Sequence, residues 1–254
     1  MTPKVSVIVN CFNGELFLRD CLKSIFDQTY ENWEIIFVNN ASTDESLAVV
    51  QSYSSEKIKI INLLENISLV EARMIAIGAS SGDFVSFLDV DDLWHPRRIE
   101  EFIEFAERKN AKFIYSNTYF FNNIKRYKIY KKIMPSGWIT NKLIPKYFIS
   151  LEAIMIHREI LSEIKINKSM KYTYDLDLVL KASTLTEFYY LNEALSYWRM
   201  HESSATNKNR IPFVIERWNW SQSEFAKSNI RKYNLILYKL RLIVEYIYFK
   251  YVSK

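Results

Sequence analysis

Three aspartates fall within four positions, Asp89, Asp91 and Asp92, directly after the apolar residues Phe84, Val85, Phe87 and Leu88. Clustered carboxylates repel one another and raise each other's proton affinity unless a cation offsets the repulsion. A divalent metal with oxygen ligands would do so, and it would also hold the phosphates of a substrate. The cluster therefore predicts a metal and phosphate site. The alternative left open is that Asp91 and Asp92 only begin the turn into a helix at Pro96.

Short β-branched and aromatic runs alternate with amphipathic segments around this cluster. The predicted strands are Val5–Val9, Glu34–Val38, Ile58–Leu63, Phe84–Leu88 and Lys112–Tyr119. Two of the helices between them should begin with Ser-x-x-Glu capping boxes, at Ser42–Glu45 and Ser68–Glu71. This alternation predicts an α/β fold, with a mostly parallel sheet covered by helices on both faces. Ligands of such sheets bind outside the carboxyl ends of the strands, where the aspartates lie.

The composition of the chain limits the size of its core and the kinds of partner that it can bind. The 254 residues are 49% hydrophobic, enough for one large core with or without an appendage. Residues 1–110 carry 10 basic and 18 acidic side chains, whereas residues 111–254 carry 24 and 11. The basic half could face a phosphate-bearing partner or an anionic membrane, or could be only a solvated surface. No nucleic-acid-binding signature is visible, and the acidic cluster would repel phosphate without metal, so no nucleic-acid partner is predicted.

The cysteines and the glycines exclude further classes. Only Cys11 and Cys21 occur, which suggests no disulfide framework, and no signal peptide is recognisable, so a cytoplasmic location is expected. No uncharged apolar stretch approaches the roughly 20 residues that span a bilayer. The four glycines form neither a dinucleotide fingerprint nor a phosphate loop.

Two stretches carry a family resemblance. "VSVIVNCFNGELFLRDCLKSIFDQTYENWEIIFVNNASTDES" and "ENISLVEARMIAIGASSGDFVSFLDVDD" resemble the nucleotide-binding half of glycosyltransferase family 2, which has the GT-A fold, a Rossmann-like sheet with flanking helices. The resemblance continues to about residue 205. It implies a metal-dependent, inverting hexosyl- or N-acetylhexosaminyltransferase that uses Mn²⁺ or Mg²⁺ and a nucleoside-diphosphate sugar, most commonly a UDP-sugar.

The resemblance also implies roles for donor-binding residues. Cys11 and Phe12 correspond to the loop that packs the nucleotide base, and Asn40 to an aspartate that accepts a hydrogen bond from that base. Arg73, in "EARMIA", corresponds to an arginine near the nucleotide. Asp89 and Asp91 correspond to the Asp-x-Asp motif. The first acid of that motif lies near the ribose, and the second binds the metal.

Catalytic and diphosphate-binding roles follow in the second half of the chain. "MKYTYDLDLVLKAS" resembles the family segment whose first aspartate is the catalytic base, so Asp175 is the expected base and Asp177 a structural residue. Either acid could instead cap the helix that follows. "EALSYWRMHESSAT" resembles the segment that approaches the donor diphosphate, which implies donor contact for Arg199 and metal or leaving-group contact for His201.

One departure from the family pattern keeps an alternative open. The usual "VDDGSTD" reads "VNNASTD" here, with Asn39 and Asn40 in place of two aspartates. An asparagine carbonyl can still accept a hydrogen bond from a base. The pair could equally be two turn residues that bind no ligand, and the chain a catalytically silent relative that binds sugar nucleotides.

The second half also suggests where the acceptor binds. The predicted domain of residues 1–207 divides into a nucleotide-sugar half, 1–110, and an acceptor half, 111–207. Within the latter, residues 120–147 carry seven basic side chains and several aromatic ones, suited to a glycan or lipid-linked acceptor or to a solvated loop. Glu152 could line the acceptor side or be solvated. The expected pathway is bacterial surface-polysaccharide synthesis, for example of capsule or lipopolysaccharide.

A basic, aromatic-rich extension, residues 208–254, is predicted to be helical. Its apolar residues cover more of a helical wheel than a simple amphipathic helix would show. The extension could pack on its own domain, pack on a partner subunit in a homodimer, or lie on an anionic membrane surface at the inner face of the cytoplasmic membrane.

Overall fold

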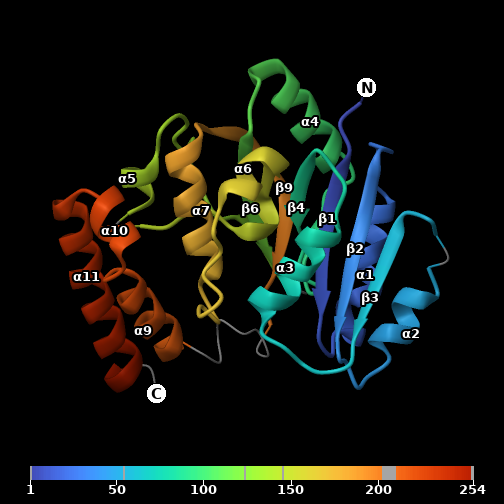
Figure 1. The fold of residues 1–254 in the computed structure, drawn as a ribbon, viewed down its shortest axis with the longest axis horizontal. Coiled ribbons are helices and arrows are strands. Elements are labelled where there is room, and N and C mark those ends of the chain that lie inside the picture. The colour runs from blue at the N-terminus through green and yellow to red at the C-terminus, as the bar shows by residue number, and fades with distance from the viewer. Residues whose placement is uncertain (1, 54, 123, 145, 202–209, 253–254) are drawn as a thin grey trace.

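A mixed sheet runs through the centre of the protein. The computed structural model describes residues 2–53, 55–122, 124–144, 146–201 and 210–252. Within them the sheet has the order β3-β2-β1-β4-β8-β6-β9-β5, with β7 paired to β6 at the side (Figure 1). The strands are β1 (Val5–Cys11), β2 (Trp33–Asn40), β3 (Ile58–Leu63), β4 (Phe84–Phe87), β5 (Leu93–Trp94), β6 (Phe113–Phe121), β7 (Arg126–Lys128), β8 (Ile154–His157) and β9 (Phe188–Arg199).

The five strands predicted from the sequence all run in one direction. Strands β1 to β4 pair in parallel, and β8 is antiparallel to both β4 and β6, so β6 again points the same way. Strand β9 pairs with β6 in parallel. The mostly parallel sheet is therefore confirmed, with β8 as an antiparallel strand that the alternation of the sequence did not reveal.

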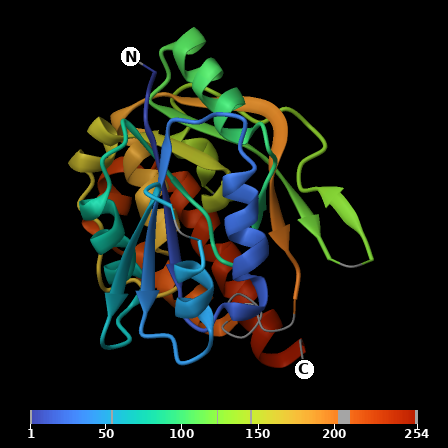
Figure 2. The same cartoon turned by 90° about the vertical axis from the view of Figure 1, so that its right-hand side faces the viewer.

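Helices cover both faces of the sheet (Figure 2). Their bounds are α1 (Glu15–Phe26), α2 (Ser46–Gln51), α3 (Leu69–Ala79), α4 (Arg98–Lys109), α5 (Thr140–Leu143), α6 (Arg158–Glu163), α7 (Tyr174–Leu185), α9 (Arg210–Trp220), α10 (Glu224–Asn229) and α11 (Lys232–Ile247). Short 3₁₀ and π segments follow at Leu151–Ala153 and Tyr248–Val252. Helices α1, α2 and α4 close one apolar core, and α3, α6 and α7 close the other.

Local sequence explains how two of these helices begin. The predicted capping box of α3 is present, because Ser68 accepts from the N–H of Glu71 and the Glu71 carboxylate accepts from Ser68. The box predicted at Ser42 is wrong. Helix α2 begins four residues later, and the Ser42 hydroxyl instead accepts from the N–H of Asn13 at 3.0 Å in the neighbouring loop.

The C-terminal helices pack on the helix that carries Asp175. The indole Nε1 of Trp220 donates to Asp177 Oδ1 at 2.9 Å, which gives Asp177 the expected structural role. The Glu216 carboxylate accepts from the N–H groups of Tyr172 (3.0 Å) and Thr173 (2.7 Å), just before α7 begins. Helix α9 therefore fixes the start of α7. The predicted domain boundary at residue 208 falls outside the described residues, and no helix in the described segments has the length and hydropathy to cross a membrane.

Candidate active site

The loops that follow β1 and β2 are tied together at the carboxyl edge of the sheet. Asn13 and Ala41 both have left-handed backbone conformations, with φ of 52° and 57°. The side-chain oxygen of Asn13 accepts from the N–H of Thr43 at 2.8 Å. These contacts give the two loops a defined shape beside the aspartate loop after β4 (Figure 2).

Arg73 joins the two halves of the protein at the centre of this edge. Its side chain, only 4% exposed, leaves α3 and contacts both the carboxylate of Asp89 and the hydroxyl of Tyr174. The guanidinium carbon also lies 4.8 Å from the centre of the Tyr174 ring. Because Tyr174 directly precedes Asp175, Arg73 links the Asp-x-Asp motif to the predicted base.

Asp175 lies in the first turn of α7, and Thr173, not either aspartate, occupies the N-cap position. Burial raises the pKa of Asp175 to about 6, while the backbone N–H of Leu176 and the charge of Arg73 lower it. The nearby carboxylate of Asp89 raises it further. A carboxylate with a pKa near the working pH is suited to accept a proton.

Asp91 faces His201 across the end of β9. Asp91 Oδ2 and His201 Nε2 lie 2.9 Å apart, and burial together with the charge of Asp89 raises the pKa of Asp91. Two ligands at right angles on one Mg²⁺ would lie about 3 Å apart, given metal–ligand bonds of about 2.1 Å. No group of three acidic, histidine or cysteine side chains able to hold a metal occurs among the described residues. Asp91 still fits such an ion, because Mg²⁺ is commonly held by one or two carboxylates and completes its shell with water and substrate phosphate. His201 Nε2 lies beside the same carboxylate oxygen.

Arg199 holds the aspartate loop from the other side. Its backbone N–H donates to Asp92 Oδ1 and its Nε donates to the carbonyl of Asp91, both at 2.9 Å. Its guanidinium also lies 3.3 Å from Asp20 and 4.8 Å from the ring of Phe121. Arg199 thus lies beside the motif, and its described contacts support the loop. The donor contact that the resemblance implied for Arg199 stays a prediction.

Asp92 and Glu152 lie beneath the loop. Asp92 is 3% exposed, and burial followed by the charge of Glu152 raises its pKa well above the usual range. Burial also raises the pKa of Glu152 to about 7, and its carboxylate accepts from the hydroxyl of Thr118 at 3.0 Å. The side chain of Glu152 is therefore buried and not solvated.

Three donor residues suggested by the resemblance lie in different surroundings. The Phe12 ring is 52% exposed at the rim, whereas the thiol of Cys11 lies in the core under α1 and leaves only its backbone for a ligand. Asn40 holds the next loop, with Nδ2 donating to the carbonyl of Ile67 at 2.8 Å and Oδ1 accepting from its N–H at 3.0 Å. One hydrogen and one lone pair of the Asn40 amide remain for a base.

Asn10 is a residue of this edge that the sequence did not single out. It is the second-last residue of β1 and 8% exposed, and neither Oδ1 nor Nδ2 has a hydrogen-bond partner among the described residues. Side chains alternate along a strand, so Asn10 shares the face of Ile8, which packs in the core beneath α3. A buried amide without a partner costs stability, so Asn10 is a candidate ligand contact on the Arg73 side of the sheet.

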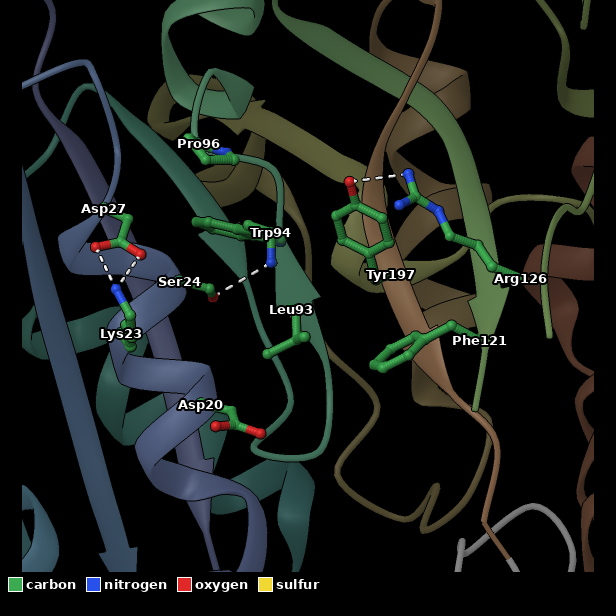
Figure 3. Close-up of a pocket in the computed structure, with 10 residues that line it drawn as sticks. All are labelled: Asp20, Lys23, Ser24, Asp27, Leu93, Trp94, Pro96, Phe121, Arg126 and Tyr197. Carbon is green, nitrogen blue, oxygen red and sulfur yellow. Dashed lines mark hydrogen bonds and ion pairs between the residues drawn. The ribbon is translucent and has the colours of Figure 1, made fainter. Parts of the chain in front are cut away.

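A hollow of about 390 Å³ lies on the α1 side of the aspartate loop (Figure 3). Asp20 and Ser24 of α1 line it on one side, and Phe121 and Tyr197 of β6 and β9 on the other. The hydroxyl of Tyr197 accepts from Arg126, which belongs to the basic segment 120–147. The segment thus forms part of the surface near the motif, through the β6–β7 hairpin.

Comparison with known proteins decides the family. Residues 6–172 match the family model described as glycosyl transferase family 2. The chain belongs to glycosyltransferase family 2. As a member of that family it is a glycosyltransferase.

Two bacterial relatives of this family 2 glycosyltransferase carry names that state a pathway or a reaction. It is 28% identical over 249 residues to Bacillus subtilis TuaG, named as a teichuronic acid biosynthesis glycosyltransferase, covering 91% of this chain and 97% of TuaG. It is 27% identical to Escherichia coli WfgD, a UDP-Glc:α-D-GlcNAc-diphosphoundecaprenol β-1,3-glucosyltransferase, covering 85% and 84%. The match to Bacillus subtilis EpsE, 38% identical, spans only 42% of this chain and 39% of EpsE.

Solved structures confirm the GT-A fold of this glycosyltransferase. The Staphylococcus aureus TarS structure with UDP-GlcNAc superposes with a TM-score of 0.73 at 20% identity, over 98% of this chain and 73% of that one. The Pyrobaculum calidifontis mannosyltransferase PcManGT, in complex with GDP-Man and Mn²⁺, superposes with a TM-score of 0.67 at 16% identity, over 97% and 70%.

Proposed function

We propose that the protein moves a sugar, with inversion, from a nucleoside-diphosphate donor to an acceptor hydroxyl in a metal-dependent reaction. The observation that carries the proposal is the contact of Arg73 with both Asp89 and Tyr174, which brings the Asp-x-Asp motif and the predicted base Asp175 to one place. The resemblance favours a UDP-sugar as donor.

In the proposed reaction Asp175 accepts the proton of the acceptor hydroxyl. The hydroxyl oxygen forms a bond to the anomeric carbon as the bond from that carbon to the diphosphate oxygen breaks. The electron pair of the broken bond leaves with the nucleoside diphosphate. Because attack and departure occur on opposite faces, an α-linked donor gives a β-glycoside.

The donor would be held at the carboxyl edge of the sheet. Phe12 can stack on the base, Asn40 can hydrogen-bond it, and Arg73 brings a positive charge toward the nucleotide. Asp91 and His201 are the residues that would hold Mn²⁺ or Mg²⁺, and a bound ion would offset negative charge on the leaving diphosphate.

The acceptor is proposed to be a glycan or a lipid-linked glycan of a bacterial surface polysaccharide. Two observations support this assignment. First, the relative TuaG is named for teichuronic acid biosynthesis, and the relative WfgD for a diphosphoundecaprenol-linked acceptor. Second, aromatic and basic side chains meet in the β6–β7 hairpin. The guanidinium of Arg126 lies 3.9 Å from the centre of the Tyr119 ring and 4.5 Å from that of Tyr197. A lipid-linked acceptor would place the enzyme at the inner face of the cytoplasmic membrane.

A donor screen tests the proposal. The protein is incubated with UDP-, GDP- and dTDP-sugars, with Mn²⁺ or with a chelator, and release of nucleoside diphosphate is followed by mass spectrometry. We expect release from one donor class that needs metal and disappears in Asp91→Ala. Binding of a sugar nucleotide by folded protein without release, with every donor and with acceptor glycans present, would instead support the catalytically silent relative.

A further inference from the structure

One side of α11 (Lys232–Ile247) and of the turn after it carries large apolar side chains that no described part of the chain covers. We call this set the α11 apolar stripe. Its members are 44% to 70% exposed. They are Tyr233, Ile236, Leu240, Ile243, Val244, Ile247 and Tyr251.

The stripe is separate from the surface that α11 uses for packing. Leu235, Tyr238 and Leu242 lie on the opposite side of the helix and are 7% exposed or less, in the apolar core shared with α7. Stripe residues such as Ile236 and Leu240 recur every three to four positions, so they form one continuous ridge. Contiguous exposed apolar surface of this kind marks an interaction site.

Positive charges border the stripe. At 100° per residue, Lys232 and Lys239 fall along one edge and Arg241 along the other. Lys250 follows in the π segment, with its Nζ 5.2 Å from the centre of the Tyr251 ring. Glu245, the acidic residue of α11, points away from the stripe and pairs with Arg217 of α9 at 2.5 Å and with Arg241 at 2.7 Å. The lysine edge is therefore cationic, whereas Glu245 offsets the charge of Arg241 at the other edge, and the stripe itself contains no carboxylate.

We propose that the α11 apolar stripe lies in the surface of an anionic phospholipid membrane. The aliphatic side chains would enter the boundary between headgroups and acyl chains, and the bordering lysines would extend to the lipid phosphates. A second copy of the chain is the less suitable partner, because Glu245, the acidic residue of α11, already pairs with Arg217 and Arg241, so a symmetric contact would bring two lysine edges together with no further carboxylate of α11.

The position of α11 connects this membrane contact with the active site. The last turns of α11 lie at the same end of the molecule as the carboxyl ends of β1, β2 and β9 (Figures 1 and 2). A membrane-bound enzyme would thus hold its active site near the membrane surface, where the headgroup of a lipid-linked acceptor lies. This consequence rests on the proposed function, whereas membrane binding itself does not.

Co-sedimentation of the full chain with vesicles tests the proposal. One set of vesicles contains phosphatidylcholine alone, and the other contains about 30% phosphatidylglycerol, a density of anionic lipid at which each basic residue near the surface contributes measurably. We expect binding to the anionic vesicles that weakens as salt is raised. Hydrogen exchange should slow in α11 when these vesicles are added.

Variants of the stripe and of its border provide the decisive comparison. Leu240→Ser with Ile247→Ser should weaken binding by about tenfold or more, since both side chains would lose apolar burial. The matched control is Leu16→Ser with Leu185→Ser, two exposed leucines on α1 and α7, which should bind as the parent does. Lys232→Glu should weaken binding at low salt by at least about fivefold.

Three results would overturn the membrane assignment: no binding of folded protein to anionic vesicles, equal binding to both kinds of vesicle, or equal loss in the stripe variant and its control. A dimer in sedimentation equilibrium that Leu240→Ser with Ile247→Ser dissociates would assign the stripe to a second copy instead. Donor turnover on a soluble acceptor is measured in parallel. Its failure with membrane binding intact would refute only the proposed function.

Discussion

His201 Nε2 lies 2.9 Å from Asp91 Oδ2, although 110 residues separate the two in the sequence. The strand that ends at Arg199 carries His201 to the aspartate loop, and Arg199 fixes that loop through its contacts with Asp91 and Asp92. The pair has the spacing of two ligands on one small divalent ion. This relationship gives the metal proposal a test that does not depend on the acceptor.

Replacing His201 by alanine should weaken metal binding more than it weakens the fold. We expect the Mn²⁺ concentration for half-maximal donor hydrolysis to rise by about tenfold or more, since one ligand is lost. The control is His157→Gln, because His157 pairs in register with Phe84 at the amino end of β4, the edge opposite the site. An unchanged Mn²⁺ requirement in His201→Ala would assign this histidine to the leaving diphosphate or to the loop.

Asp175→Asn should lower kcat by about 10²–10⁴, because the acceptor hydroxyl loses its proton acceptor. The matched control is Asp177→Asn, two residues along the same helix. It should retain turnover but unfold at lower denaturant, since Asp177 is bound to Trp220 and lies 2.6 Å from Lys181 Nζ. Equal losses of activity in the two variants would place Asp175 among the structural residues of α7.

The pH profile of the parent enzyme should show the same base. Burial raises the pKa of Asp175 to about 6, and only the unprotonated carboxylate can accept a proton. The rate should therefore fall as the pH drops through about 6, by about tenfold per pH unit below it. A rate that stays constant down to pH values near the ordinary aspartate pKa of about 4 would contradict this assignment.

Much of this architecture could be predicted because hydrophobic periodicity is local. The buried face of α1, including Leu18 and Ile25, follows the expected three-and-four spacing. Strand β4, which ends before Asp89, is buried throughout and apolar except for Ser86. Strand β8 (Ile154–His157) was missed because three apolar residues and a histidine after a 3₁₀ turn carry no such period. The Ser42 capping box failed because a hydroxyl that could cap a helix can equally bind a neighbouring loop.

The parts of the site that could not be predicted depend on contacts between distant residues. The contact of Arg73 with Tyr174 joins residues 101 positions apart, and nothing local in "YDLDL" indicates it. The sequence also left open whether the C-terminal helices cover their own domain. Trp220 and Glu216 show that they do, through bonds to the start of α7 that only the folded chain reveals.

The variant Asn10→Leu should show whether the Asn10 amide contacts the nucleotide donor or only supports the fold. Removing an unpaired buried amide should leave the free protein at least as stable, with a gain of up to about 1–2 kcal/mol. Affinity for the nucleotide should fall by about tenfold if the amide meets the donor, as measured by calorimetry with UDP and GDP. A less stable free protein with unchanged nucleotide affinity would show that Asn10 supports the fold.

Ala41→Gly should stabilise the protein, because Ala41 has a left-handed backbone with φ of 57° where the family pattern has glycine. An L-residue in this conformation costs about 1–2 kcal/mol, and the greater unfolded-state freedom of glycine offsets part of the gain. We expect a net increase of about 0.5–1 kcal/mol in the free energy of unfolding in urea. The same substitution at exposed Ala48 of helix α2 should lower stability by a similar amount, since helices disfavour glycine. Opposite signs at the two sites would show that backbone strain in the loop after β2, and not the loss of a methyl group, causes the effect. Equal destabilisation at the two sites would contradict the strained conformation of Ala41.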